Sequence, residues 1–154
     1  MQKTFLLLCM TALLSACAAT SAAPSCNLYV IALMKQKNIY LPQANANGLD
    51  NYLKDSKDWI KVPRINGKLN HKAAYLAANT GRVALATYNT HSGRSGHIAE
   101  VYGKKKMEWS MGFNALVPYV NSTVNGRKPG VSLLSQQFKP SKESRMNYYI
   151  YDKK

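Results

Sequence analysis

The sequence of 154 residues predicts one α+β domain, in which helices come first and an antiparallel sheet follows. The apolar residues predict this order, because they recur at helical spacing as far as Asn79 and alternate in the manner of strands from Arg82 onward. The composition agrees, since 46% of the residues are hydrophobic and 18% are charged. Such a balance excludes a disordered chain or a collagen-like repeat.

Three helices are expected in the first half of the domain. Ser25 occupies the N-cap position of a helix over residues 26–37, whose apolar face turns inward. A second, short helix follows Asn45. Asn70 can cap a third helix over residues 71–79, which stops where the sequence reaches a glycine.

The second half of the chain alternates between strands and polar turns. Strands are expected at residues 82–88, 97–102, 107–111 and 147–151. The segments 89–96, 103–106 and 121–130 are rich in glycine, asparagine or lysine and are expected to be turns or loops. Strands joined by such short polar turns predict antiparallel pairing.

The first 23 residues have the pattern of an export signal, so the domain is expected to span residues 24–154. Residues 4–14 form an apolar run that is too short for a permanent membrane span, and small residues follow it. Leu14-Ser15-Ala16-Cys17 also fits a lipobox, in which Cys17 would be acylated, while plain cleavage after Ala18 fits about as well. The protein is therefore expected to be periplasmic, an outer-membrane lipoprotein or secreted.

Either way of processing the leader leaves Cys26 as the one free thiol of the mature chain. An unpaired cysteine in an oxidising compartment is a liability unless it is buried or used. The three histidines form no close pair and have no cysteine beside them, so no metal site is expected, and no organic cofactor either.

The charge balance restricts the partners. Lys and Arg outnumber Asp and Glu by 21 to 7, which gives a net charge of +14. Nucleic acids, anionic membranes and bacterial walls would all attract such a chain. Export argues against nucleic acid, and no basic helix or aromatic RNA-binding motif is present. No strongly amphipathic cationic helix stands out, so membrane contact is expected only through a lipid anchor.

Cys26 at a helix start and His97 at a strand start are the residues best suited to chemistry. A helix N-terminus can lower the pKa of a thiol and can donate N–H groups to an oxyanion. A histidine nearby could take the thiol proton and deliver it to a leaving amine. The alternative interpretation of Cys26 is a small buried hydrophobic residue.

Four segments of the chain resemble the cell-wall amidases of the NlpC/P60 superfamily and, more narrowly, the first family of type VI secretion amidase effectors. They are Ser25-Cys26-Asn27, Leu41-Pro42 with Asn45-Ala46-Asn47, Ser95-Gly96-His97-Ile98-Ala99-Glu100-Val101, and Met146-Asn147-Tyr148-Tyr149-Ile150-Tyr151. The resemblance spans about residues 24–151. It implies a papain-like fold, in which the N-terminal helix with Cys26 packs on an antiparallel sheet. The export leader departs from that effector family and leaves wall remodelling and antibacterial action both open.

The resemblance further implies a peptidoglycan amidase that cuts a stem-peptide bond, typically between γ-D-glutamate and diaminopimelate. Cys26 would be the nucleophile and His97 the general base and acid. A third residue would orient the imidazole, and the strand after the His97 strand offers Ser110 and Glu108, to which similarity assigns Ser110. Both could equally be ordinary surface groups. The alternative function is a catalytically inert, cationic wall-binding module.

Three further residues are candidates for contact with stem peptides. Asn45 and Asn47 could read their carbonyls and carboxylates, or could cap the following helix. His91 could line the groove, or be a solvated loop residue. His71 is expected on the exterior of its helix. The chain is expected to be monomeric, and an immunity protein is a partner that the effector resemblance would add.

Overall fold

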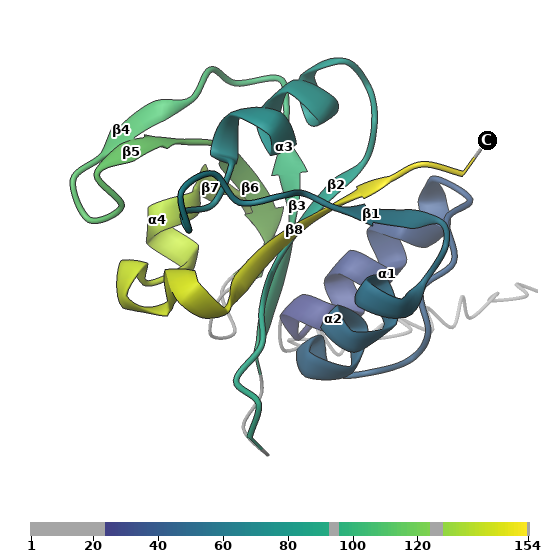
Figure 1. Cartoon of the computed structure of the whole chain (residues 1–154). Helices are drawn as coiled ribbons and strands as arrows, with labels where there is room; N and C mark the ends of the chain where they lie inside the picture. Colours follow the sequence, from purple (N-terminus) through teal and green to yellow (C-terminus); the bar gives the residue numbers. More distant parts are fainter. Residues whose placement is uncertain (1–23, 93–95, 124–127, 154) are drawn as a thin grey trace, which may run out of the picture.

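The computed structural model describes residues 24–92, 96–123 and 128–153 (Figure 1). The leader expected over residues 1–23, with the lipidation candidate Cys17, lies outside them. None of the helices described combines the length and apolar character that crossing a membrane requires.

The domain is built on a six-stranded antiparallel sheet with the order β1-β8-β2-β3-β6-β7. Its strands are β1 (Trp59–Lys61), β2 (Ala84–Tyr88), β3 (His97–Tyr102), β6 (Tyr119–Ser122), β7 (Gly130–Leu133) and β8 (Met146–Tyr151). A separate two-stranded sheet pairs β4 (Glu108–Ser110) with β5 (Ala115–Val117). The helices are α1 (Cys26–Gln36), α2 (Ala46–Asp55), α3 (His71–Asn79), α4 (Leu134–Gln137) and the 3-10 helix η1 (Pro140–Arg145). The predicted α+β class is confirmed.

Each face of the large sheet carries its own hydrophobic core. One core joins α1 and α2 to residues such as Leu85, Ile98 and Tyr149, and the other joins α3 to their sequence neighbours Ala86 and Ala99. Adjacent strand residues point to opposite faces, which explains why neighbours belong to different cores. Helices consequently cover both faces of the sheet, with α1 and α2 on one face and α3 on the other (Figure 1).

The predicted helices agree closely with those observed, and α3 has the expected bounds. The side chain of Asn45 accepts a hydrogen bond from the N–H of Gly48 at 2.9 Å, and that of Asn70 accepts one from Ala73 at 3.0 Å. Ser25 occupies the N-cap position of α1, but its side chain makes no capping bond. At two of the three helix starts, a free backbone N–H group is therefore capped by the side-chain oxygen of the asparagine that the sequence indicates.

The expectation that residues 121–130 are entirely turn or loop is wrong at both ends of the segment. Strand β6 continues to Ser122, and β7 begins at Gly130, so both ends of the segment pair with each other. Residues 124–127 lie outside the described part of the chain.

The expectation that His71 lies on the exterior of its helix is wrong. His71 is buried, and its Nδ1 lies 2.8 Å from the hydroxyl of Tyr148. Its ring also meets the ring of Phe113 edge-on, at 5.5 Å between centroids. Burial lowers the pKa of His71 to about 4, which keeps the imidazole neutral inside the core.

Candidate active site

The start of α1 is held against the sheet by polar contacts on both sides of Cys26. Thr123 donates from its hydroxyl to the carbonyl of Pro24 at 2.8 Å, and Tyr29 donates to Oδ1 of Asn121 at 3.1 Å. The side chain of Asn27 donates to the carbonyl of Ala44 at 2.9 Å. These bonds fix the helix N-terminus beside strands β3 and β6.

Three backbone N–H groups converge on the thiol of Cys26. They belong to Cys26 itself, to Asn27 and to Ile98 on strand β3, and each favours the ionised sulfur. Burial has the opposite and larger effect, so the pKa of the Cys26 thiol lies above its ordinary value. The expectation that the helix N-terminus lowers this pKa is therefore wrong, because desolvation outweighs the amides. The resting thiol is protonated at neutral pH.

His97 is the first residue of β3, directly before the Ile98 amide that contacts Cys26. The residue before it is Gly96, where a Cβ atom would overlap the carbonyl oxygen of Tyr88 and the side chain of Asn47. Only glycine permits this close approach to the neighbouring strand. The Gly-His pair seen in the sequence thus has a steric reason.

Two residues of the segment around α4 hold the imidazole of His97. The ring of Phe138 packs on it at 4.7 Å between centroids, and Oε1 of Gln137 lies 3.3 Å from Nε2. Burial lowers the pKa of His97, and the contact with Gln137 partly offsets this effect. His97 is thus held neutral, in the form that can accept a proton.

The surroundings of Gln137 determine which nitrogen of His97 carries the proton. The amide nitrogen of Gln137 donates to the carbonyl of Val120 at 3.4 Å and to the hydroxyl of Ser132 at 2.7 Å. Because a carbonyl can only accept, the NH₂ group must face Val120 and the amide oxygen must face His97. The imidazole then donates from Nε2–H, which leaves the lone pair of Nδ1 free to act as a base.

The Ile98 amide that contacts Cys26 directly follows His97 in the chain, but the His97 ring packs on Phe138, which belongs to the core on the other face of the sheet from α1. Both side chains are electrically neutral. In the described part of the chain the hydrogen bond of the imidazole is made to Gln137, and none joins it to the sulfur. Hydrogen bonds between catalytic groups are often long in a free enzyme and tighten only with substrate. A proton could therefore pass from the thiol to Nδ1 only once substrate brings the two groups together, and the resting state holds no thiolate–imidazolium pair.

The expectation that Ser110 orients the imidazole of His97 is wrong. It lies on β4, which pairs with β5 in the separate sheet, whereas β3 is flanked by β2 and β6. Its hydroxyl accepts from the backbone N–H of Phe113 at 3.4 Å and so stabilises the turn after β4. The alternative residue, Glu108, is exposed and accepts from the hydroxyl of Tyr119 at 2.5 Å. Gln137 makes the contact expected of Ser110, from 40 residues beyond His97.

The other candidate residues serve the loop before β3. Asn45 caps α2, while Nδ2 of Asn47 donates to the hydroxyl of Thr90 at 2.7 Å and to the carbonyl of Ser92 at 3.1 Å. His91 is exposed in that loop and has a left-handed backbone with a φ of 52°. The structure thus favours the local, structural interpretation of both asparagines over direct contact with substrate.

A buried carboxylate, which the sequence analysis did not single out, also holds this loop. Asp50 of α2 accepts hydrogen bonds from the hydroxyl of Thr87 and from the amides of Asn89 and Asn147, the last two at 3.1 and 3.3 Å. Asn89 in turn accepts from the N–H of His91 at 2.8 Å. Helix α2 and strands β2 and β8 are thereby joined at the end of the sheet where His97 lies.

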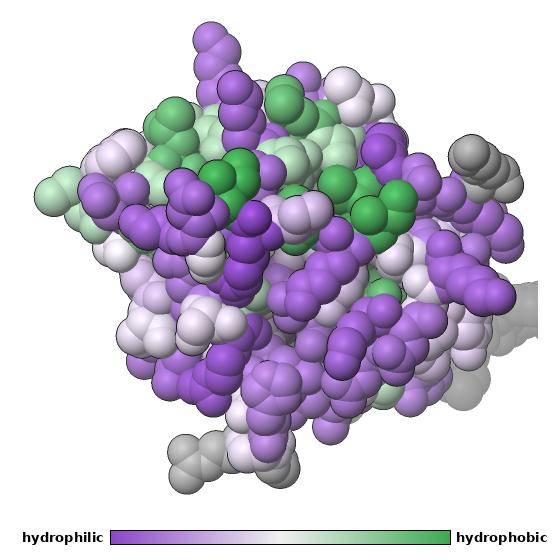
Figure 2. Space-filling view, viewed as in Figure 1, coloured by the Kyte–Doolittle hydropathy of each residue, from purple (hydrophilic) through white to green (hydrophobic). Residues whose placement is uncertain are grey.

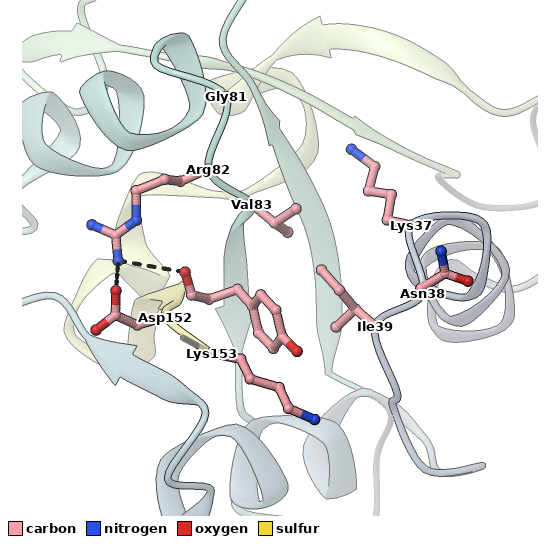
Figure 3. Close-up of a pocket in the computed structure, with 9 residues that line it drawn as sticks. Lys37, Asn38, Ile39, Gly81, Arg82, Val83, Asp152 and Lys153 are labelled. Atoms are coloured by element: carbon pink, nitrogen blue, oxygen red, sulfur yellow. Dashed lines mark hydrogen bonds and ion pairs between the residues drawn. The ribbon is translucent and has the colours of Figure 1, made fainter.

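A hollow of about 420 Å³ lies beside Gln137, between β7 and α4. Its lining residues are Ser122, Lys128, Gly130, Val131, Ser132, Gln136 and Gln137. A larger hollow of about 570 Å³, drawn in Figure 3, lies at the other end of α1, beside Lys37 and the ion pair of Arg82 with Asp152. At a rise of about 1.5 Å per residue, the length of α1 separates that hollow from Cys26. The smaller hollow borders the residue that contacts His97, although neither His97 nor Cys26 lines it.

Among the residues described, no three His, Cys, Asp or Glu side chains gather in a way that could hold a metal ion. No family model matches this chain, and no curated protein is similar enough to it to count as a match.

Proposed function

We propose that this domain is a cysteine amidase that hydrolyses a stem-peptide amide bond of peptidoglycan. One observation carries the proposal: the Cys26 thiol, at a helix N-terminus, touches the amide next to His97, whose imidazole is fixed by Gln137 and Phe138. The domain would have a papain-like fold, because a leading helix supplies the thiol and a later strand supplies the base. The resemblance described above supplies the substrate class.

In the first step, Nδ1 of His97 takes the proton of Cys26 while the sulfur attacks the carbonyl carbon of the scissile amide. The backbone N–H groups of Cys26 and Asn27, which face the thiol, would stabilise the oxygen that becomes negative. The C–N bond then breaks, and the proton held by His97 passes to the leaving amine. Water hydrolyses the thioester in the second half, which releases the carboxylic acid and restores the thiol.

The neutral ground state of the pair agrees with this scheme. A base must be unprotonated before it accepts a proton, and the pKa of His97 is lowered by burial, so the imidazole is unprotonated at neutral pH. Gln137 is a positioning residue in the scheme, since its carbonyl oxygen receives Nε2–H and thereby leaves Nδ1 unprotonated.

The charge of the chain supports a wall polymer as substrate. A net charge of +14 would attract the carboxylates of stem peptides from a distance, and the leader would carry the domain out of the cytoplasm. We therefore propose an exported, monomeric enzyme. An immunity protein would be its partner if it acts against other bacteria.

The test is hydrolysis of purified sacculi, with the released muropeptides identified by mass spectrometry. Cys26→Ala should abolish release while binding to sacculi is kept, and His97→Ala should lower the rate by about 10²–10⁴. The matched control is His91→Ala, an exposed histidine six positions earlier, which should leave the rate unchanged. Release that persists in Cys26→Ala would refute the mechanism. Binding without hydrolysis by the unaltered chain would favour the inert wall-binding module.

A further inference from the structure

The β4–β5 hairpin presents an exposed apolar face that the proposed chemistry does not use. Trp109 and Leu116 are directly opposite each other across the two strands, and they are 56% and 53% exposed. Met111, in the turn after β4, is 86% exposed. The opposite face of the hairpin is buried through Ser110 and Val117. Because side chains alternate along a strand, the hairpin has one side in the core and one apolar side in solvent.

Three lysines adjoin this face. Lys104, Lys105 and Lys106 form the turn that leads into β4, and all three are exposed. The ammonium group of Lys105 lies over the ring of Tyr119, at 4.2 Å from its centroid. Figure 2 shows hydrophobic residues in several places across the upper half of the molecule, over α3, near the hairpin and over β1, while the lower part of this face is mainly hydrophilic.

We propose that the β4–β5 hairpin docks on the surface of an anionic phospholipid bilayer, with Trp109, Met111 and Leu116 entering the interface and Lys104–Lys106 contacting the headgroups. Tryptophan with aliphatic neighbours and adjacent lysines is the composition that settles at the boundary between acyl chains and headgroups. Apolar insertion and electrostatic attraction to anionic lipid act together in such docking, and the hairpin projects from the edge of the domain (Figure 1).

Charge and size favour a bilayer over the other occupants of such a face. A second copy of this chain would bring the same three lysines and a further net charge of +14 against the first, so the two surfaces would repel. A stable protein partner usually covers about 800 Å² on each side, with about 20 residues, whereas this face offers three exposed apolar side chains. A wall glycan carries no apolar phase into which Met111 and Leu116 could be transferred.

Trp109 provides a direct probe of this docking. The chain has two tryptophans, and the other, Trp59, is 5% exposed and packed against Tyr151. In the full chain with Trp59→Phe, all tryptophan emission comes from the hairpin, whatever the leader does. Addition of phosphatidylglycerol-containing vesicles should shift this emission to shorter wavelength, and brominated acyl chains should quench it. Vesicles of phosphatidylcholine alone should do neither.

Two sets of variants separate the parts of the surface. Replacing Lys104, Lys105 and Lys106 by Gln should weaken binding to anionic vesicles about 100-fold, at about fivefold for each lysine. The matched control replaces Lys54, Lys57 and Lys61, which are also exposed but lie on α2 and around β1. That control should change binding by less than about threefold at physiological salt.

The apolar part is tested by Met111→Ser with Leu116→Ser, which should weaken binding about tenfold or more. Its control is Ile60→Ser on β1, where the side chain is 47% exposed. Trp109 emission that stays unchanged while the chain sediments with anionic vesicles would overturn the proposal. So would equal losses in the two lysine sets. A shift that grows with protein concentration in the absence of lipid would assign the face to a second copy, and a shift only on sacculi would assign it to the wall.

Discussion

The pH dependence of Cys26 alkylation distinguishes a neutral thiol from a preformed ion pair. Burial raises the pKa of the Cys26 thiol above its ordinary value, and the amides of Ile98, Asn27 and Cys26 do not overcome this effect. With its pKa above the ordinary value, the thiol is almost entirely protonated at pH 7. The alkylation rate should therefore rise about tenfold for each pH unit between 6 and 8, in proportion to the thiolate.

The assay is modification of the folded chain by iodoacetamide, followed by intact mass spectrometry at each pH. In His97→Ala the slope between pH 6 and 8 should be the same, because the imidazole contributes no positive charge to the resting pair. Hydrolysis of sacculi should be lost in the same variant. An imidazolium partner would instead hold the thiol ionised, and its removal would shift the alkylation profile to higher pH.

The same protonation states predict the acid side of the activity profile. Burial lowers the pKa of His97 below its ordinary value of about 6.5, so the neutral imidazole persists as the pH falls through 6.5. The acid limb of kcat/KM should then lie below pH 6.5. An alkylation rate that is flat between pH 6 and 8, or a His97→Ala profile displaced upward by a full unit, would refute the neutral pair.

Three further predictions concern the residues that support the site. Gln137→Ala should lower kcat about tenfold or more if Gln137 fixes the tautomer of His97, and it should move the acid limb of the pH profile to lower pH, because the contact with Gln137 raises the pKa of His97. Ser110→Ala should change neither. Acidification from pH 6.5 to 4 should lower the free energy of unfolding by about 3 kcal/mol through His71. The pKa of His71 is about 4 in the folded protein and about 6.5 in the unfolded chain, so between these values the proton binds and stabilises the unfolded chain. Urea titrations of His71→Leu should show a smaller acid effect. Gly96→Ala should cost about 1–3 kcal/mol of stability, measured by thermal unfolding, since its Cβ would overlap a backbone carbonyl; an unchanged melting temperature would contradict that steric role.

The sequence predicts those parts of the fold that local signals determine. Asn70 and the glycine after Thr80 bracket α3, and the alternation from His97 predicts β3 with its observed bounds. Strand β1 carries no such signal, because its three residues pair with β8 only through contacts between residues some 90 positions apart. Short strands of this kind depend on the tertiary fold and not on their own pattern.

The site shows the same division between local and distant determinants. Cys26 and His97 follow from a helix start and a strand start, which the sequence marks. The third residue does not, because strand β6 rather than β4 adjoins β3, and α4 then brings Gln137 to the imidazole. The prediction that His71 lies on the helix exterior is wrong for a related reason. A polar residue at a helix start is expected in solvent, yet the hydroxyl of Tyr148 gives it a buried partner.

The protonation state of Cys26 connects the site to the compartment that the leader predicts. Oxidants and disulfides react with the thiolate, and the rate falls as the ionised fraction falls. If the chain is exported as we propose, a permanent ion pair would expose Cys26 to such reactions, whereas a partly buried, protonated thiol reacts slowly. Ionisation would then occur only when the scissile carbonyl is in place and Nδ1 of His97 accepts the proton. The same burial that makes the thiol a weak nucleophile at rest would thus preserve it for catalysis outside the cytoplasm.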